Sequence, residues 1–425
     1  IKKINLKEFL KTFLRVVVTG IGTINSTGHN VKDSFEAVVN GVCGIDAITL
    51  FDTSEFSVKI AGEVKDFDPT TVMDKKEVKK ADRFIQLGIK AALEAMIDSG
   101  YVTEENKKVD ASIADRFGMI SGSGIGGLST IERNSVVCET KGSRKVSPFF
   151  IPSSLANMLS GFISIEHNLR GPSLSHVTAC AASTHALNDA VKTIMIGGAD
   201  RILVVGAESA ICPAGVAGFA AMKALSTRND DPKKSSRPFD IDRDGFVMGE
   251  GAGALVVEDL ELALARGAKI YAEIIGFGES GDANHITSPV MDGPLRAMQA
   301  AFEMAKNLTG EYPKIDYINA HGTSTPVGDK NETAAIKALF NGKENTPLVS
   351  STKGQIGHCL GAAGAIEAIF TIKALNEGII PPTINIENQD PECDLDYVAN
   401  VARKAELTTV MSNNFGFGGT NANIN

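Results

Sequence analysis

Cys180 has the sequence surroundings of a catalytic thiol. It follows the β-type run 173–179 and opens the small-residue segment "CAASTHAL". A thiol at the start of a helix lies near free backbone N–H groups and the positive end of the helix dipole, which lower its pKa and favour the thiolate. The sequence therefore predicts a nucleophile at Cys180, with a small buried core residue as the alternative.

Two histidines stand at similar junctions later in the chain. His321 ends the β-type run in "INAHGTSTPVGD", and His358 follows Lys353 in "SSTKGQIGHCLGAAGA". A nearby ammonium group and a helix start both disfavour a charged imidazole, so His358 is predicted to stay neutral and to donate a hydrogen bond. Either histidine alone would more often be structural, but two histidines at such junctions, beside a third junction that holds Cys180, favour a functional role.

Two further histidines receive no catalytic role. His185 lies beyond Cys180 on the predicted helix, and five residues of helix turn a side chain about 140° away. His176 lies within the preceding strand. Neither is predicted to face the thiol.

Metal and dinucleotide sites are weaker hypotheses. His358 and Cys359 are ligand types, but adjacent helical residues point about 100° apart, so no metal is predicted. The stretch "GSGIGG" at 122–127 matches the G-x-G-x-x-G pattern of dinucleotide-binding turns. The acidic residue expected about 20 positions later is absent, which favours a tight turn with close backbone approach.

Composition limits the class of protein and its partners. The chain has 425 residues and a formal net charge of −9, which argues against nucleic acid or an anionic membrane as the main partner. Its 6 cysteines are scattered without a CxxC pair, which fits a reducing, cytoplasmic setting. No apolar run reaches the length of about 18 residues that membrane insertion requires.

Short apolar strands alternate with helical segments from residue 15 onward, which predicts an α/β chain. Strands are predicted over 15–22, 116–121, 173–179, 201–209, 253–258, 272–278, 316–320, 347–352 and 408–414. Helices are predicted over 82–100, 153–169, 181–198, 294–308, 331–340 and 362–378.

The helices after Cys180 and His358 are rich in Ala, Gly, Ser and Thr, which suits helices packed closely between two sheets. Each follows a β-rich run, so the chain shows a faint internal duplication. We predict an N-terminal extension at 1–14, a first half at 15–266 with cap insertions and the nucleophile, and a second half at 267–425 with both histidines.

Four ordered motifs, "VTACAAST", "NAHGTSTPVGD", "SSTKGQIGH" and "SNNFGFGGTN", resemble those of the β-ketoacyl-(acyl carrier protein) synthases. The resemblance covers nearly the whole chain from Arg15 and is strongest to the bacterial elongation enzymes of the synthase II type. It implies the thiolase fold, a five-layer αβαβα arrangement of two similar halves, and a homodimer that binds no cofactor of its own.

The resemblance also implies an acyltransferase reaction. Cys180 would accept an acyl chain from the phosphopantetheine arm of acyl carrier protein, and decarboxylation of a malonyl thioester would then drive the Claisen condensation of fatty acid elongation. His321 and His358 would stabilise the enolate, and the backbone N–H groups of Cys180 and Phe417 would form an oxyanion hole.

Further residues receive roles through the resemblance alone. Lys353 would organise the site electrostatically, and Glu367 would be structural. The predicted substrate-binding residues are Thr323 and Thr325 for the pantetheine arm, Phe417 as a gate, and Ile125 and Phe219 for the acyl pocket. The predicted docking residues for the acidic carrier protein are Lys76, Lys79, Lys80, Arg144, Lys145 and Lys223. Lys76, Lys79 and Lys80 in "KKEVKK" would share one helical face, although a solvated charged face is the alternative.

Three other functions compete with the condensing enzyme. A thiolase characteristically carries a second cysteine near the C-terminal glycine-rich loop, and "NNFGFGGTN" has none. A catalytically silent chain-length subunit typically lacks the nucleophile, and Cys180 is present. A nicotinamide oxidoreductase would depend on the "GSGIGG" turn.

Overall fold

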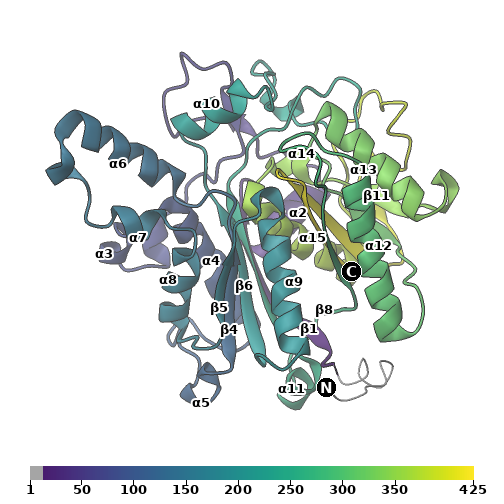
Figure 1. The fold of residues 1–425 in the computed structure, drawn as a ribbon, viewed down its shortest axis with the longest axis horizontal. Helices are drawn as coiled ribbons and strands as arrows, with labels where there is room; N and C mark the ends of the chain where they lie inside the picture. The colour runs from purple at the N-terminus through teal and green to yellow at the C-terminus, as the bar shows by residue number, and fades with distance from the viewer. Residues whose placement is uncertain (1–12) are drawn as a thin grey trace.

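The structure, a computed structural model, describes residues 13–425 (Figure 1). Most of the predicted extension at 1–14 therefore lies outside the described residues. No helix in the described part of the chain is both long enough and apolar enough to cross a membrane.

The strands lie close to their predicted positions. They are β1 (Val16–Asn25), β2 (Asp46–Ala47), β3 (Ile60–Ala61), β4 (Phe117–Gly122), β5 (Ser173–His176), β6 (Arg201–Glu208), β7 (Gly251–Asp259), β8 (Ala272–Ile274), β9 (Phe277–Gly281), β10 (Tyr317–Asn319), β11 (Leu348–Ser350), β12 (Ile379–Ile380), β13 (Arg403–Lys404), β14 (Val410–Gly416) and β15 (Thr420–Ile424).

The helices connect these strands and cover the sheets. They are α2 (Val31–Val39), α3 (Lys75–Val78), α4 (Arg83–Asp98), α5 (Ala111–Ala114), α6 (Leu128–Lys141), α7 (Phe150–Ser154), α8 (Met158–His167), α9 (Ala182–Met195), α10 (Pro213–Ala221), α11 (Leu260–Ala265), α12 (Asp292–Thr309), α13 (Pro326–Leu339), α14 (Lys353–Ile356) and α15 (Ala363–Glu377). The helix predicted over 153–169 is wrong as one element, because α7 ends before α8 begins.

Two large sheets repeat one topology. The first has the strand order β5-β4-β6-β7-β1-β8, and the second has the order β11-β10-β14-β15-β9. In the first, β4 runs parallel to β5 and β6, while β7 runs antiparallel to β6 and β1. In the second, β10 runs parallel to β11 and β14, while β15 runs antiparallel to β14 and β9. Apart from the edge strand β8, the two sheets match in order and direction, as an internal duplication requires.

Helices separate and cover the two sheets in five layers (Figure 1). Helix α4 packs on the outer face of the first sheet, α9 and α15 lie between the sheets, and α12 covers the outer face of the second sheet beside α13. This is the predicted αβαβα arrangement of the thiolase fold.

The small side chains of α9 and α15 permit this close packing. A Cβ atom added to Gly364 of α15 would lie 2.0 Å from Thr184 Oγ1 of α9. On the sheet side, a Cβ atom on Gly206 of β6 would lie 2.4 Å from Ser183 Cβ. Both helices are buried on nearly all sides. The predicted pair of helices between sheets is therefore confirmed.

The strand predicted over 272–278 is wrong as a single element. Its first part, β8, pairs with β1 in the first sheet, and its second part, β9, pairs with β15 in the second. The chain crosses between the sheets here, so β8 joins the first sheet although it follows residue 266. The division of the chain between 266 and 267 stays a prediction.

Candidate active site

Two equivalent turns, one in each half, lie at Cys180 and just after His358. Cys180 belongs to a short 3-10 turn, η3 (Ala179–Ala181), that leads directly into α9. His358 precedes the corresponding turn η6 (Leu360–Ala362), which leads into α15. Ala179 and Leu360 begin these turns with left-handed φ angles of 50° and 47°. The two turns pack against each other between the sheets, which brings the two helix starts together.

One cavity of about 350 Å³ receives the three predicted catalytic side chains. Cys180, His321 and His358 all line it. The other predicted residues in its wall are Phe219, Lys223, Thr323, Thr325 and Phe417. The hydroxyl groups of Thr323 and Thr325 are 3.0 Å apart, and Lys223 is exposed.

The two imidazole rings are held neutral. Burial lowers the pKa of His358 well below its usual value, and the Lys353 ammonium lowers it further. The pKa of His321 is lowered in the same way by burial, Lys353 and His358. The Nδ1 atoms of both rings are buried and have no hydrogen-bond partner in the described part of the chain. The prediction of a neutral His358 is confirmed.

A carboxylate that the sequence did not indicate supports His321. The backbone N–H groups of His321 and Gly322 each donate to the Glu332 carboxylate at 2.8 Å. Glu332 lies on α13 and is buried, and burial raises its pKa to about 7. Nothing in the local spacing marks Glu332, because its partners are the N–H groups of a loop outside its own helix.

Lys353 and Glu367 form a buried ion pair behind the cavity. Lys353 Nζ donates to Glu367 Oε1, and Asn414 Nδ2 donates to Glu367 Oε2 at 2.7 Å. Burial raises the pKa of Glu367, while Lys353 opposes that shift. Neither side chain lines the cavity, so Lys353 acts on the histidines through its charge.

The prediction of a low thiol pKa is wrong. Burial raises the pKa of Cys180 to about 12, and the nearby Glu208 carboxylate adds to the shift. Lys353 and the backbone N–H groups of Phe417 and Cys180 act in the opposite direction without overcoming it. The loss of solvent around the sulfur outweighs the electrostatic effect of a short turn, so the resting group is a thiol.

The predicted acyl-pocket residues belong to the apolar surroundings of Cys180. Ile125 and Phe219 pack against an apolar cluster that contains both Cys180 and Leu360. Ile125 itself does not line the main cavity. Phe417 lies in the turn between β14 and β15, 37% exposed, with its ring 6.4 Å from that of Phe219.

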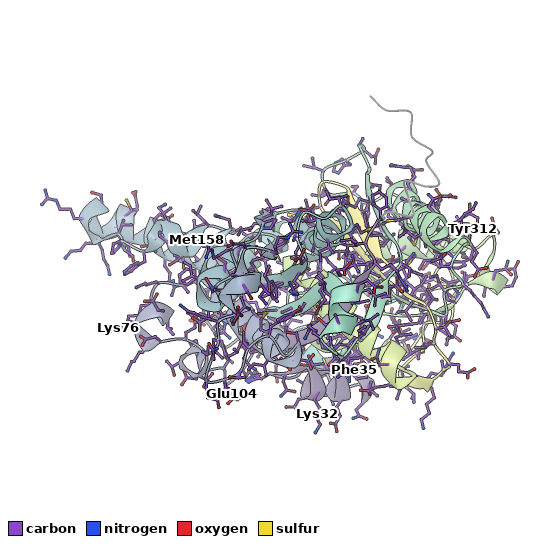
Figure 2. All side chains as sticks on the ribbon, turned by 90° about the horizontal axis from the view of Figure 1, so that it is seen from below. Lys32, Phe35, Lys76, Glu104, Met158 and Tyr312 are labelled. Atoms are coloured by element: carbon purple, nitrogen blue, oxygen red, sulfur yellow. The ribbon has the colours of Figure 1, made fainter. Side chains whose placement is uncertain are left out.

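The predicted docking residues are mostly exposed, but their helical arrangement is wrong. Helix α3 ends at Val78, so Lys79 caps it and Lys80 lies beyond it. Lys80 pairs with Glu77 at 2.6 Å and lies over the Phe149 ring. Lys76 is exposed at the periphery of the molecule (Figure 2). Lys79, Arg144 and Lys145 are also exposed.

His185 and His176, the two histidines that the sequence analysis set aside, lie away from the cavity wall. His185 Nδ1 is 2.8 Å from Thr178 Oγ1, and His176 Nε2 is 3.0 Å from Asp189 Oδ2. Among residues 13–425, no three His, Cys, Asp or Glu side chains gather as metal ligands would. The Cys359 thiol lies 3.6 Å from the Glu250 carbonyl oxygen.

Comparison with known families supplies an independent assignment. Residues 14–263 match the family described as "Beta-ketoacyl synthase, N-terminal domain", and residues 271–387 match "Beta-ketoacyl synthase, C-terminal domain". The chain belongs to the beta-ketoacyl synthase family. Among curated members, the "3-oxoacyl-[acyl-carrier-protein] synthase 2" of Vibrio cholerae is 51% identical over 415 residues, which cover 96% of this chain and 98% of that one. The protein of the same name from Coxiella burnetii is 48% identical over 411 residues, covering 96% and 97%.

Solved structures of beta-ketoacyl synthases share the fold. A beta-ketoacyl synthase from Burkholderia phymatum superposes with a TM-score of 0.88 at 35% identity, covering 97% of this chain and 98% of that one. A type II PKS ketosynthase, solved in complex with its acyl-carrier protein, superposes with a TM-score of 0.85 at 29% identity, covering 97% and 98%.

Proposed function

We propose that the protein catalyses the decarboxylating Claisen condensation of an acyl thioester with malonyl-(acyl carrier protein). The product is 3-oxoacyl-(acyl carrier protein), and the reaction is the elongation step of fatty acid synthesis. The observation that carries this proposal is the shared cavity of Cys180, His321 and His358 in a beta-ketoacyl synthase. Curated relatives about half identical in sequence carry the name of this activity.

The first step transfers the acyl chain to Cys180. The sulfur attacks the thioester carbonyl, a new S–C bond forms, and the pantetheine thiolate leaves and takes up the proton of the Cys180 thiol. Because the leaving group is itself a thiolate, no strong general acid is needed. The N–H groups of Cys180 and Phe417 act on the sulfur, which supports a role for them as donors to the oxyanion that forms beside it.

The second step breaks the bond between the malonyl methylene and its carboxylate. Carbon dioxide leaves, and its bonding electrons form an enolate on the remaining thioester. The neutral rings of His321 and His358 donate N–H hydrogen bonds to the enolate oxygen. The enolate carbon then attacks the acyl carbonyl on Cys180, the Cys180 thiolate leaves as the new C–C bond forms, and this thiolate takes up a proton from solvent to restore the thiol.

Acyl carrier protein delivers both substrates on its phosphopantetheine arm. Thr323 and Thr325 line the cavity and offer hydroxyl groups to that arm. The exposed side chains of Lys76, Lys79, Arg144, Lys145 and Lys223 supply positive charge for an acidic carrier. The type II PKS ketosynthase structure in complex with its acyl-carrier protein supports a carrier partner.

A homodimer in the cytoplasm completes the proposal. Strand β5 is an edge of the first sheet, and edge strands present unpaired backbone groups to a second chain. Leu174 on this strand is 47% exposed, and the nearby Val177 and Ile165 are 55% and 75% exposed. Light scattering should report a dimer for the native chain and a monomer for Leu174→Asp.

A reducing compartment suits the free thiols of the chain, which are Cys43, Cys138, Cys180, Cys212, Cys359 and Cys393.

A reconstituted assay tests the proposed activity. Purified protein is incubated with acyl-(acyl carrier protein) and malonyl-(acyl carrier protein), and carbon dioxide and 3-oxoacyl product are measured. Both should appear with the native chain, and the condensation product should vanish with Cys180→Ala. A native chain that yields neither product would overturn the proposal.

A further inference from the structure

The glycine-rich turn at 122–127 encloses a carboxylate from the same chain. Glu208, the last residue of β6, is fully buried and accepts the Ser123 hydroxyl at 3.0 Å. The backbone N–H groups of Gly124, Ile125 and Gly126 donate to the same carboxylate at 2.6, 3.2 and 3.2 Å. Glycine-rich turns hold phosphates through such converging N–H groups. Here Glu208 occupies the place of the anion, so the turn is no dinucleotide site.

The same carboxylate reaches the loop that follows His358. The backbone N–H of Gly361 donates to Glu208 Oε2 at 3.0 Å. A Cβ atom on Gly361 would lie only 2.1 Å from the backbone nitrogen of Gly124. The backbones of the two loops are therefore in contact, and both loops donate hydrogen bonds to the Glu208 carboxylate.

These two loops carry apolar side chains to the thiol. Ile125 from the first loop packs against the cluster that contains Cys180 and Leu360, and Leu360 comes from the second loop. Leu360 also lines the active-site cavity and has a left-handed φ of 47°. The position of both side chains beside Cys180 thus depends on loops that share one buried hydrogen-bond acceptor.

The hydrogen bonds that join the two loops through Glu208 depend on the negative charge of its carboxylate. Within residues 13–425, the donors to Glu208 are four backbone N–H groups and one hydroxyl, with no Lys or Arg among them. Burial raises the pKa of Glu208, and those N–H groups oppose the shift. A buried carboxylate is costly unless its donors stay in place, so the ion and the two loops order each other.

We propose that Glu208 is a positioning residue that sets the range of acyl chain lengths the enzyme accepts. It does so by holding Ile125 and Leu360 in the apolar cluster that contains Cys180. The inference rests on the proposed function, because the acyl chain on Cys180 is the ligand that these two side chains would meet.

Glu208→Gln tests the link, because the amide keeps the shape of the side chain but turns an NH₂ group toward N–H donors. The readout is the rate of acylation of Cys180, followed by intact-protein mass with acyl-(acyl carrier protein) substrates of increasing chain length. We expect the ratio of rates for the longest and shortest chains to change about tenfold, the scale on which an apolar pocket discriminates a methylene. Decarboxylation of malonyl-(acyl carrier protein) should change much less.

Glu63→Gln is the matched control. Glu63 is also buried and accepts the N–H groups of Thr49 and Leu50 at 2.8 and 3.1 Å, but it contacts neither active-site loop through a hydrogen bond. This variant should keep the native ratio of acylation rates for the longest and shortest acyl chains. If Glu208→Gln does not fold, Ser123→Ala, which removes one donor to Glu208, should shift the ratio in the same direction by a smaller factor.

A double variant separates positioning from general loss of structure. If Glu208 acts through Ile125 and Leu360, Glu208→Gln should shift the ratio of an Ile125→Ala protein less than that of the native chain, because only Leu360 remains to be displaced. An unchanged ratio in the single Glu208→Gln and Ser123→Ala variants, or an equal shift in the Glu63→Gln protein, would overturn the inference. A native protein that is not acylated at Cys180 by any chain would overturn the proposed function instead, and the inference with it.

Discussion

The imidazole rings of His321 and His358 lie edge to face, with their centroids 5.3 Å apart and their planes at 87°. Their approach follows from the second sheet. His321 comes just after β10, and His358 comes after β11 and the short helix α14. These strands are parallel neighbours with Asn319 opposite Ser350, so their carboxyl ends meet at one edge of the sheet.

His321 and His358 should be needed for decarboxylation of the malonyl thioester and not for acyl transfer to Cys180. In His321→Asn or His358→Asn one N–H donor to the enolate is lost or misplaced, which lowers the rate of decarboxylation about 10²- to 10³-fold. Acylation of Cys180 uses other donors and should stay within a few-fold of the native rate. Carbon dioxide release and intact-protein mass measure the two steps separately. Equal losses in both steps would contradict this division of roles.

The depressed histidine pKa values predict a loss of stability in mild acid. Below the unfolded-state pKa of about 6.5, the unfolded chain binds protons at His321 and His358 that the native chain excludes. Stability should therefore fall as the pH drops below about 6.5, by up to about 1.4 kcal/mol per pH unit for each histidine. Urea denaturation at several pH values measures the slope. His321→Asn should reduce it, and an unchanged slope would argue against a buried neutral His321.

The ion pair of Lys353 and Glu367 should be costly to break from one side. Lys353→Met leaves the Glu367 carboxylate buried without its cation, and both side chains are at most 1% exposed. Removal of one partner of such a pair destabilises by about 3–5 kcal/mol. The double variant Lys353→Met, Glu367→Gln should recover part of that loss in urea denaturation. A double variant as unstable as the single one would show that the charge is not the cause.

The sequence predicted the parts of the site that depend on local order along the chain. Cys180, His321 and His358 were predicted because each stands at a strand-to-loop or loop-to-helix junction, which the local sequence marks. Glu208 and Glu332 were missed because the loops whose N–H groups they accept lie elsewhere in the chain. The prediction of a low thiol pKa was wrong for a similar reason. The helix start can be recognised in the local sequence, but the burial that raises the pKa of Cys180 comes from tertiary packing.

The exposed basic residues should matter only when the substrate is carried by a protein. Arg144→Glu and Lys145→Glu should raise the KM for acyl-(acyl carrier protein) about tenfold, because a rim charge that attracts the carrier would repel it. The KM for a small acyl-pantetheine thioester should not change. Lys404→Glu, an exposed charge on β13 in the second half, serves as the control. An equal rise with the small thioester would place the effect in the cavity instead of at the docking surface.

The contact between helices α9 and α15 should reverse the usual effect of a glycine-to-alanine substitution on the stability of the protein. In an open helix the change stabilises by up to about 1 kcal/mol. At Gly364 the new methyl group would lie 2.0 Å from Thr184 Oγ1, so Gly364→Ala should destabilise by about 1–3 kcal/mol through overpacking. Gly161 in α8 is the control, because its nearest neighbours to an added Cβ are Met158 atoms at 3.6 Å. Urea denaturation should therefore show opposite signs for Gly364→Ala and Gly161→Ala, and a stabilised Gly364→Ala protein would mean that α9 and α15 lie farther apart.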